Sequence, residues 1–269
     1  QQQVEKAGVP APRIIGVDEI SIRKGHNYRI VVSDLERGRP IWVGGSGRTE
    51  EDLDLFFVWL GPAKTRRIKH AVMDMWKAFR SSVKKHVPGV LIVYDKFHII
   101  RHLNDAMDRV RRSEYRRLVG KDRSFIKGQR YTLLTKRKNL RLSGRQALRK
   151  LFKANRRLYV AYTLKETFEQ LWSFKTPGGA RRFFERWRDS LKWQRLPAYE
   201  KFAKMIDRHW DGIVSYCKPE NKCSLGMVEG LNTKIRVLQR RAYGYRDEEF
   251  LKLKIIAAFL PPLGREGLK

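Results

Sequence analysis

Carboxylate side chains that follow apolar runs are the residues of this sequence best suited to chemistry. Asp18 and Glu19 follow the apolar residues 14–17, Asp74 follows another apolar run, and Glu229 lies much later in the chain. Carboxylate oxygens are the ligands that hard divalent cations prefer. Two such cations roughly 3.5–4 Å apart can activate an attacking hydroxyl and stabilise a leaving oxygen in phosphodiester cleavage. We therefore predict that Asp18, Asp74 and Glu229 bind two Mg²⁺ ions, which Mn²⁺ can replace.

Each acid taken alone has a simpler interpretation. An aspartate directly after a strand commonly serves as a turn or cap residue. The combination is more specific, because acids at the ends of neighbouring strands and on a helix packed across them can meet around a metal pair.

The charge balance indicates a polyanionic partner. The 269 residues include 59 Lys and Arg against 28 Asp and Glu, a net charge of +31. This excess of positive charge is larger than an ordinary solvated protein surface carries. Nucleic acid is the polyanionic partner that best accounts for it. With 42% hydrophobic residues the chain can bury a sizeable core, so a disordered protein is excluded. No apolar stretch approaches the roughly 20 residues of a membrane span, so we expect an intracellular protein without a membrane partner.

The two cysteines do not form a recognisable metal motif. Cys217 and Cys223 could bind zinc together with His209, but a fourth ligand and a known spacing are missing. We expect reduced thiols instead.

The elements that must position the acids follow from hydrophobic periodicity. Within the first hundred residues, period-two and period-3.6 patterns alternate, which predicts an α/β layer in the order β-β-β-α-β-α-β. The expected strands are residues 13–20, 28–34, 40–45, 68–73 and 90–94. The expected helices are residues 50–60, capped by Thr49, and residues 77–86. Asp18 would then lie on a central strand, with Asp74 at the end of its neighbour.

A long basic segment separates this layer from Glu229. Residues 111–157 contain 18 basic and 2 acidic side chains, and such a segment would repel itself strongly without a polyanion. Contact with a DNA backbone is therefore favoured over a merely solvated helix face. The aromatic residues of this segment and of the helical region after it are expected to form that region's own core, namely Tyr115, Phe125, Tyr131, Phe152, Trp172, Trp187, Trp193 and Trp210. The predicted DNA contacts are Arg111, Arg112, Arg116, Arg117, Lys136, Arg137 and Lys138.

The spacing of apolar residues in the last part of the chain predicts two helices, and the first of them carries Glu229. Asn232, Thr233 and Arg236 lie three, four and seven residues further on, so one helical face can present them to phosphate beside the metals. Lys234, Arg240 and Arg241 are further candidates for DNA contact. A solvated rim is the alternative interpretation for these three.

Four segments carry a resemblance to a known family. They are residues 16–19 (GVDE), 94–98 (YDKFH), 228–236 (VEGLNTKIR) and 240–246 (RRAYGYR). Together they resemble the catalytic region of bacterial insertion-sequence transposases of the ISL-three family. The resemblance implies an RNase H-like mixed sheet with helices on both faces, a DDE metal site, and a large helical insertion before the last acid. It divides the chain into a catalytic core, residues 10–108 and 225–269, and a basic helical lobe, residues 109–224.

The resemblance leaves two candidates for the middle acid. Asp74 is favoured because the second acid of RNase H-like transposases ends the fourth strand. Asp95 and His98 match an Asp-x-x-His motif that Mutator-like transposases carry one strand later. We assign them an accessory role in orienting metal ligands or positioning DNA.

The implied activity is cleavage at transposon ends followed by strand transfer into target DNA. A structure-specific nuclease of the same fold and a non-catalytic nucleic-acid-binding protein are the alternatives. The resemblance further implies a homodimer assembled on DNA, in the bacterial cytoplasm at the nucleoid. Family members begin with a zinc-binding and helix-turn-helix region, so we expect this chain to be a catalytic fragment or a truncated copy.

Overall fold

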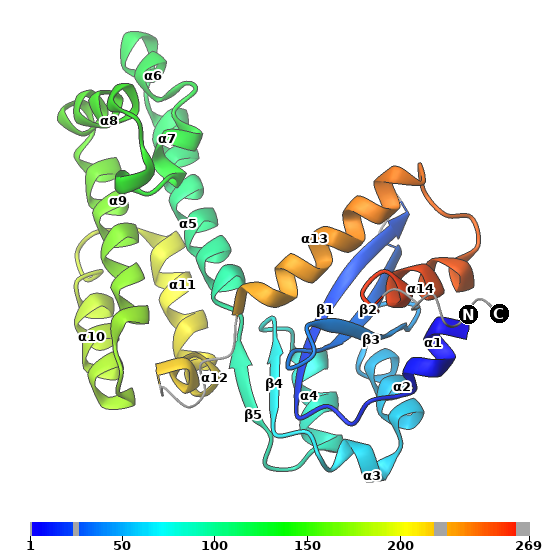
Figure 1. Ribbon diagram of the computed structural model, residues 1–269. Helices are drawn as coiled ribbons and strands as arrows, with labels where there is room; N and C mark the ends of the chain where they lie inside the picture. Colours follow the sequence, from blue (N-terminus) through cyan, green and yellow to red (C-terminus); the bar gives the residue numbers. More distant parts are fainter. Residues whose placement is uncertain (1, 24–26, 218–224, 262–269) are drawn as a thin grey trace. The chain divides into compact units, whose positions relative to one another are not determined.

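The structure is a computed structural model that describes residues 2–23, 27–217 and 225–261. The chain forms two compact units, which we call the sheet unit (residues 1–95 and 223–269) and the helical unit (residues 96–222) (Figure 1). The boundary predicted after residue 108 falls inside α5 (Lys96–Arg117), a single helix of 22 residues, whereas the two units divide at the start of that helix. Its uninterrupted helical pattern gives no sign of a boundary.

The sheet unit contains a mixed five-stranded sheet, as predicted. Three antiparallel strands form a meander, and two further strands run parallel to the first, giving the order β3-β2-β1-β4-β5. The strands are β1 (Ile14–Arg23), β2 (Asn27–Asp34), β3 (Arg39–Gly44), β4 (His70–Met73) and β5 (Leu91–Tyr94). β1 is thus central, with β2 on one side and β4 on the other.

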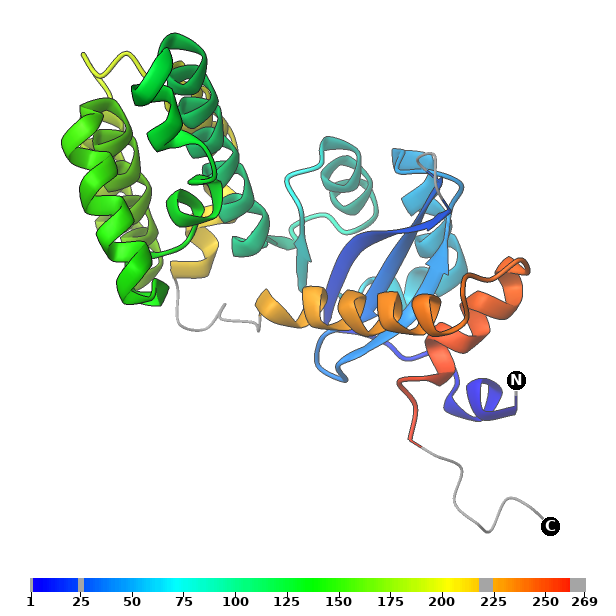
Figure 2. The same ribbon diagram turned by 90° about the horizontal axis from the view of Figure 1, so that it is seen from above.

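Helices cover both faces of this sheet (Figure 2). On one face lie α2 (Glu50–Leu60) and α4 (Lys77–His86), and on the other lie α13 (Leu225–Arg241) and α14 (Glu248–Ala257). Two short helices, α1 (Gln2–Ala7) and α3 (Pro62–Thr65), were not predicted.

The start of α2 shows how local sequence determines these elements. The Thr49 hydroxyl accepts a hydrogen bond from the Asp52 amide, and the Asp52 carboxylate accepts one from the Thr49 amide. This reciprocal capping satisfies amides that the first helical turn leaves without partners.

The core on the α13 side of the sheet determines which β1 residues face that helix. Ile20 of β1, Val31 of β2 and Val43 of β3 pack against Ile235 of α13 and Ile255 of α14. Alternate residues of a strand share a face, so Asp18 and Gly16 point to the same side as Ile20.

The helical unit has a core of its own. Its helices are α5, α6 (Gly120–Ile126), α7 (Arg130–Leu134), α8 (Leu142–Ala154), α9 (Arg156–Phe168), α10 (Pro177–Asp189), α11 (Pro197–Arg208) and α12 (Trp210–Val214), with 3₁₀ turns η1 (Arg137–Asn139), η2 (Glu169–Ser173) and η3 (Ser215–Cys217). Phe168, Trp187 and Phe202 stack edge to face in its centre. The predicted aromatic core is present in part: Trp187 lies in it, whereas Phe125 is 49% exposed, Tyr131 75% and Trp193 93%. Within the described residues, no helix is long and apolar enough to cross a membrane.

Candidate active site

Asp18 lies on the face of β1 against which α13 packs. Three alternate β1 residues meet three α13 residues at helical spacing. A Cβ on Gly16 would lie 2.7 Å from Val228 Cγ2, the Asp18 carboxylate meets Asn232, and Ile20 packs with Ile235.

Gly16 permits this close approach. Besides Val228, a Cβ at this position would lie 2.8 Å from Leu35 Cδ2. Real Cβ atoms do not tolerate such distances, so any larger residue would push α13 or Leu35 away. Gly16 thereby allows Val228, and with it the adjacent Glu229, to lie close to β1.

Both oxygens of the Asp18 carboxylate accept hydrogen bonds. Oδ2 accepts from Asn232 Nδ2 at 2.5 Å, and Oδ1 accepts from the amide of Glu19 at 2.8 Å. Asn232 is 1% exposed. The sequence predicted a phosphate contact for Asn232, but the structure buries its amide and directs it at Asp18. Asn232 is thus a positioning residue for that carboxylate.

Asp74 and Asp95 directly follow β4 and β5. Val17 pairs with Met73, and Met73 pairs with Tyr94. Continuing this parallel register by one residue puts Asp18, which lies within β1, next to Asp74 at the end of β4, and Asp74 next to Asp95 at the end of β5.

The two later aspartates differ in burial. Asp74 is half-buried, and its Oδ1 accepts from the Met75 amide at 2.6 Å. Asp95 is 3% exposed, and its amide donates to the Met73 carbonyl at 3.0 Å. Asp74 is therefore the more accessible to a metal or substrate.

Glu229 is half-buried on α13, between Val228 and Gly230. In the described ranges, no group of three or more His, Cys, Asp and Glu side chains is close enough to hold a metal ion. The donor types nevertheless suit Mg²⁺, because Asp18, Asp74 and Glu229 offer only carboxylate oxygens. Their metal-binding role stays a prediction.

Arg48 binds Glu19, which points to the face of β1 opposite to Asp18, and the sequence did not reveal this contact. Its Nη1 lies 3.1 Å from Glu19 Oε1, and its guanidinium lies over the rings of Tyr28 (4.6 Å) and Trp76 (4.9 Å). These partners come from separate segments of the sheet unit, so no local pattern could have indicated them.

Other acids of the sheet unit have structural partners. Asp54 accepts from Ser82 Oγ and Lys85 Nζ, each at 2.6 Å, and lies 2.9 Å from His86 Nε2. Burial alone would raise the pKa of Asp54, but donation from Lys85 and Ser82 outweighs it and lowers the pKa. Asp54 thus joins α2 to α4.

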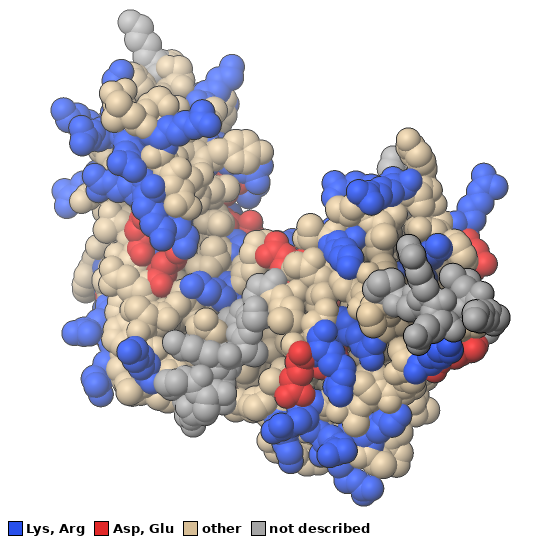
Figure 3. All heavy atoms as spheres, in the orientation of Figure 1, with Lys and Arg blue, Asp and Glu red and all other residues tan. Residues whose placement is uncertain are grey.

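The predicted basic contacts of the helical unit fall into two groups. Arg111, Arg112, Arg117 and Lys136 form ion pairs within the unit, with Asp108, Glu114 or Glu169. Arg116, Arg137 and Lys138 have exposed side chains. Figure 3 shows Lys and Arg crowding the surface around α7 and α8.

Among the four predicted DNA-contacting cations of α13, Lys234 differs from the other three. Lys234 donates to the Ala258 carbonyl at 2.8 Å and lies 4.1 Å from the centre of the Phe259 ring, so it fastens the end of α14. Arg236, Arg240 and Arg241 have exposed side chains. Of the predicted α13 cations, these three are available to a ligand.

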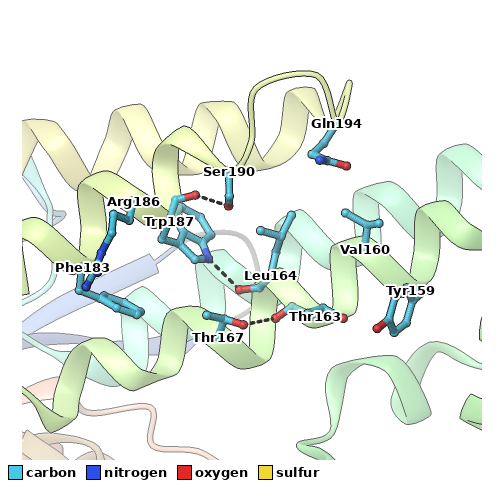
Figure 4. Close-up of a pocket in the computed structure, with 10 residues that line it drawn as sticks. All are labelled: Tyr159, Val160, Thr163, Leu164, Thr167, Phe183, Arg186, Trp187, Ser190 and Gln194. Carbon is cyan, nitrogen blue, oxygen red and sulfur yellow. Dashed lines mark hydrogen bonds between the residues drawn. The ribbon is translucent and has the colours of Figure 1, made fainter.

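A pocket of about 540 Å³ lies between α9 and α10 in the helical unit (Figure 4). Its wall includes Trp187, whose indole N–H donates to the Leu164 carbonyl at 2.9 Å. The lining contains no carboxylate, so the pocket is not a site for a hard metal ion.

The remaining sequence candidates lie in or beside the helical unit. His98 is half-buried on α5, with its ring edge-on to Phe97, and its accessory role stays a prediction. Cys217 is a buried free thiol, Cys223 lies outside the described residues, and His209 Nδ1 is 2.9 Å from the Met205 carbonyl.

Comparison with known proteins agrees with these motifs. A family model for ISL-three elements, described as transposase, matches residues 15–255. The transposase for insertion sequence element IS1001 of Bordetella parapertussis is 35% identical over 248 residues, which is 91% of this chain and 60% of that protein. The transposase for insertion sequence element IS1557 of Mycobacterium tuberculosis is 30% identical over 262 residues, 89% of this chain and 58% of that protein. The chain thus spans about three fifths of the length of these curated relatives. With the family model covering most of its length, the chain belongs to the ISL-three family of insertion-sequence transposases.

Proposed function

We propose that this chain is the catalytic region of a DDE transposase with an RNase H-like sheet, which cuts DNA at the ends of its element and joins them to target DNA. The observation that carries the proposal is the register of β1, β4 and β5. In this register Asp18, within β1, lies next to Asp74, which directly follows β4, and Asp74 lies next to Asp95, which directly follows β5; α13, which carries Glu229, packs against β1. The family relationship supports the same interpretation.

Asp18, Asp74 and Glu229 would hold the Mg²⁺ or Mn²⁺ ions. When bound, such ions lower the pKa of an attacking water or hydroxyl and stabilise the leaving oxygen. Asn232 holds the Asp18 carboxylate in place. Asp95 and His98 would orient the ligands or the DNA.

DNA binding would use the basic surfaces of both units. Arg116, Arg137 and Lys138 of the helical unit, with Arg236 of α13, are exposed cations suited to phosphate. The protein would act as a homodimer assembled on the transposon ends and target DNA, in the bacterial cytoplasm at the nucleoid.

The test is a strand-transfer assay with DNA that carries the element's own ends, a target plasmid and Mg²⁺. Wild-type protein should cut the ends and join them to the plasmid, whereas Asp18→Asn, Asp74→Asn and Glu229→Gln should each lose both steps while remaining folded. Glu249→Gln, which removes an exposed carboxylate of α14, is the matched control and should retain activity.

Two outcomes would contradict the proposal. Cleavage without joined products would indicate a nuclease. Absence of metal-dependent cleavage by a folded, DNA-bound wild-type protein would indicate a non-catalytic binding protein.

A further inference from the structure

The turn that ends α13 contains a residue with an unusual backbone conformation. The Gly244 amide donates to the Gln239 carbonyl at 3.0 Å, and the Tyr243 amide donates to the Arg240 carbonyl at 3.1 Å. These two bonds form the Schellman motif, in which the penultimate position adopts the left-handed conformation and strongly favours glycine. Here that position is Tyr243, with φ 53°.

The ring of Tyr243 contributes nothing to packing. The residue is 101% exposed, whereas Tyr245, two residues later, packs against the core of β1, α13 and α14. A tyrosine in the left-handed region is strained, because its Cβ crowds the following carbonyl. Glycine at this position would relieve the backbone strain. The presence of an exposed aromatic ring here therefore points to a ligand outside the fold.

The surroundings of Tyr243 suit nucleic acid. Arg240, Arg241 and Arg246 flank it with exposed side chains, and Figure 3 shows Lys and Arg gathered at this end of α13. An aromatic ring among cations is the combination that binds single-stranded nucleic acid, through base stacking and phosphate contact. In duplex DNA the faces of the bases are already covered by their stacked neighbours. An exposed ring can therefore stack only on an unpaired base.

We propose that Tyr243 is a stacking platform for an unpaired DNA base, with Arg240 and Arg241 binding the adjacent phosphates. The proposal rests on the proposed function in one respect, namely that the polyanion bound by this chain is DNA. The transient single-stranded segments at a DNA end would be its natural ligand.

Two variants of the full 269-residue chain separate the ring from the backbone strain. Tyr243→Gly removes the ring and relieves the left-handed strain, so its Tm should stay equal or rise by about 2 °C. Tyr243→Phe keeps the aromatic face and is the matched control. A fall in Tm of Tyr243→Gly would show that the ring stabilises the fold and would overturn the proposal.

Binding is measured by fluorescence anisotropy with a 20-nucleotide oligothymidine and with a blunt duplex of 20 base pairs. Tyr243→Gly should bind the oligothymidine about tenfold more weakly than wild type, while duplex affinity changes less than twofold. Tyr243→Phe should match wild type on both. In a single strand containing 2-aminopurine, stacking should quench fluorescence with wild type and Tyr243→Phe but not with Tyr243→Gly.

Unchanged oligothymidine affinity and quenching in Tyr243→Gly would overturn the stacking role while leaving the proposed function intact. An equal loss on both DNA probes would show that the ring contacts duplex DNA, and would also overturn it. If wild type binds neither probe, the proposed DNA activity itself fails, and the stacking role fails with it.

Discussion

Asp18 differs from Asp34 and Asp52, two other carboxylates of the sheet unit, in the origin of its partner. Asp34 and Asp52 accept hydrogen bonds mainly from residues of their own loop or turn. Asp18 instead accepts one from Asn232, on a helix 214 residues away in sequence. A buried amide directed at a carboxylate fixes its orientation, and removing one partner leaves the other unsatisfied.

We therefore predict that Asn232→Ala lowers the free energy of unfolding by about 1–2 kcal/mol, because Asp18 Oδ2 loses its donor. Cleavage should fall further than stability explains, since Asp18 would no longer be held. Urea unfolding and the strand-transfer assay measure the two effects. Glu249→Gln, which changes an exposed side chain of α14, is the control and should change neither. Equal stability and activity of Asn232→Ala and wild type would refute a positioning role.

At the scale of elements, the approach of α13 to β1 depends on Gly16. Gly16→Ala should destabilise the protein by about 1–3 kcal/mol, because the added Cβ would lie 2.7 Å from Val228 Cγ2. Displacement of α13 should also reduce metal-dependent cleavage. Both are measured against Gly230→Ala, whose added Cβ has no atom within 4 Å and which should stabilise the helix slightly.

Combining Gly16→Ala with Val228→Ala provides the check on this mechanism. The smaller Val228 side chain should restore part of the lost stability, and a double-mutant cycle measures that coupling. Strict additivity of the two substitutions would mean that contact between these residues is not the cause.

A second link attaches α14 to the sheet. Arg29 of β2 forms a bidentate ion pair with Glu248, in which Nη2 donates to Oε2 at 2.7 Å. Donation from Arg29 lowers the pKa of Glu248 from its usual 4.5. A lowered pKa means that the stabilisation is complete above about pH 4.5 and is lost as the pH falls through the lower value of the folded state.

Glu248→Gln should accordingly lower stability at pH 7 by about 1 kcal/mol, a modest value because both side chains are partly exposed. The difference from wild type should shrink as the pH drops below 4.5. Thermal unfolding of both proteins between pH 7 and pH 3 measures it. A difference that is independent of pH would show that charge at Glu248 is not responsible.

Local sequence predicted the elements better than their contacts. The cap at Thr49 located the start of α2, and apolar runs located β4 and β5 to within about two residues, because caps and periodicity act over a few positions. The burial of Asn232 was not predictable in this way. It interrupts the apolar stripe of Val228, Leu231 and Ile235, and its partner lies on a strand at the other end of the chain. The role of Gly16 was also not predictable from local sequence, because it depends on which helix packs against β1 at that position.

At the scale of the whole molecule, the charge of +31 should make DNA binding strongly salt-dependent. The logarithm of the binding constant should fall linearly with the logarithm of salt concentration, with a slope of roughly −0.9 for each neutralised phosphate. Affinity should differ little among unrelated duplexes, because backbone contacts carry no sequence information. Titrations between 50 and 200 mM salt with two unrelated duplexes measure both properties. A flat salt response, or strong preference for one duplex, would contradict this account.

The central claim is that Asp18 within β1 and Asp74 directly after β4, with Glu229 of α13, hold the metal ions. The most direct measurement is anomalous diffraction from crystals of the DNA-bound protein grown with Mn²⁺. We predict two peaks roughly 3.5–4 Å apart, with Asp18, Asp74 and Glu229 as ligands and Asp95 outside the coordination shell. Peaks coordinated by Asp95 in place of Asp74 would reassign the second ligand, and Mn²⁺ bound away from Asp18 would contradict the site as a whole.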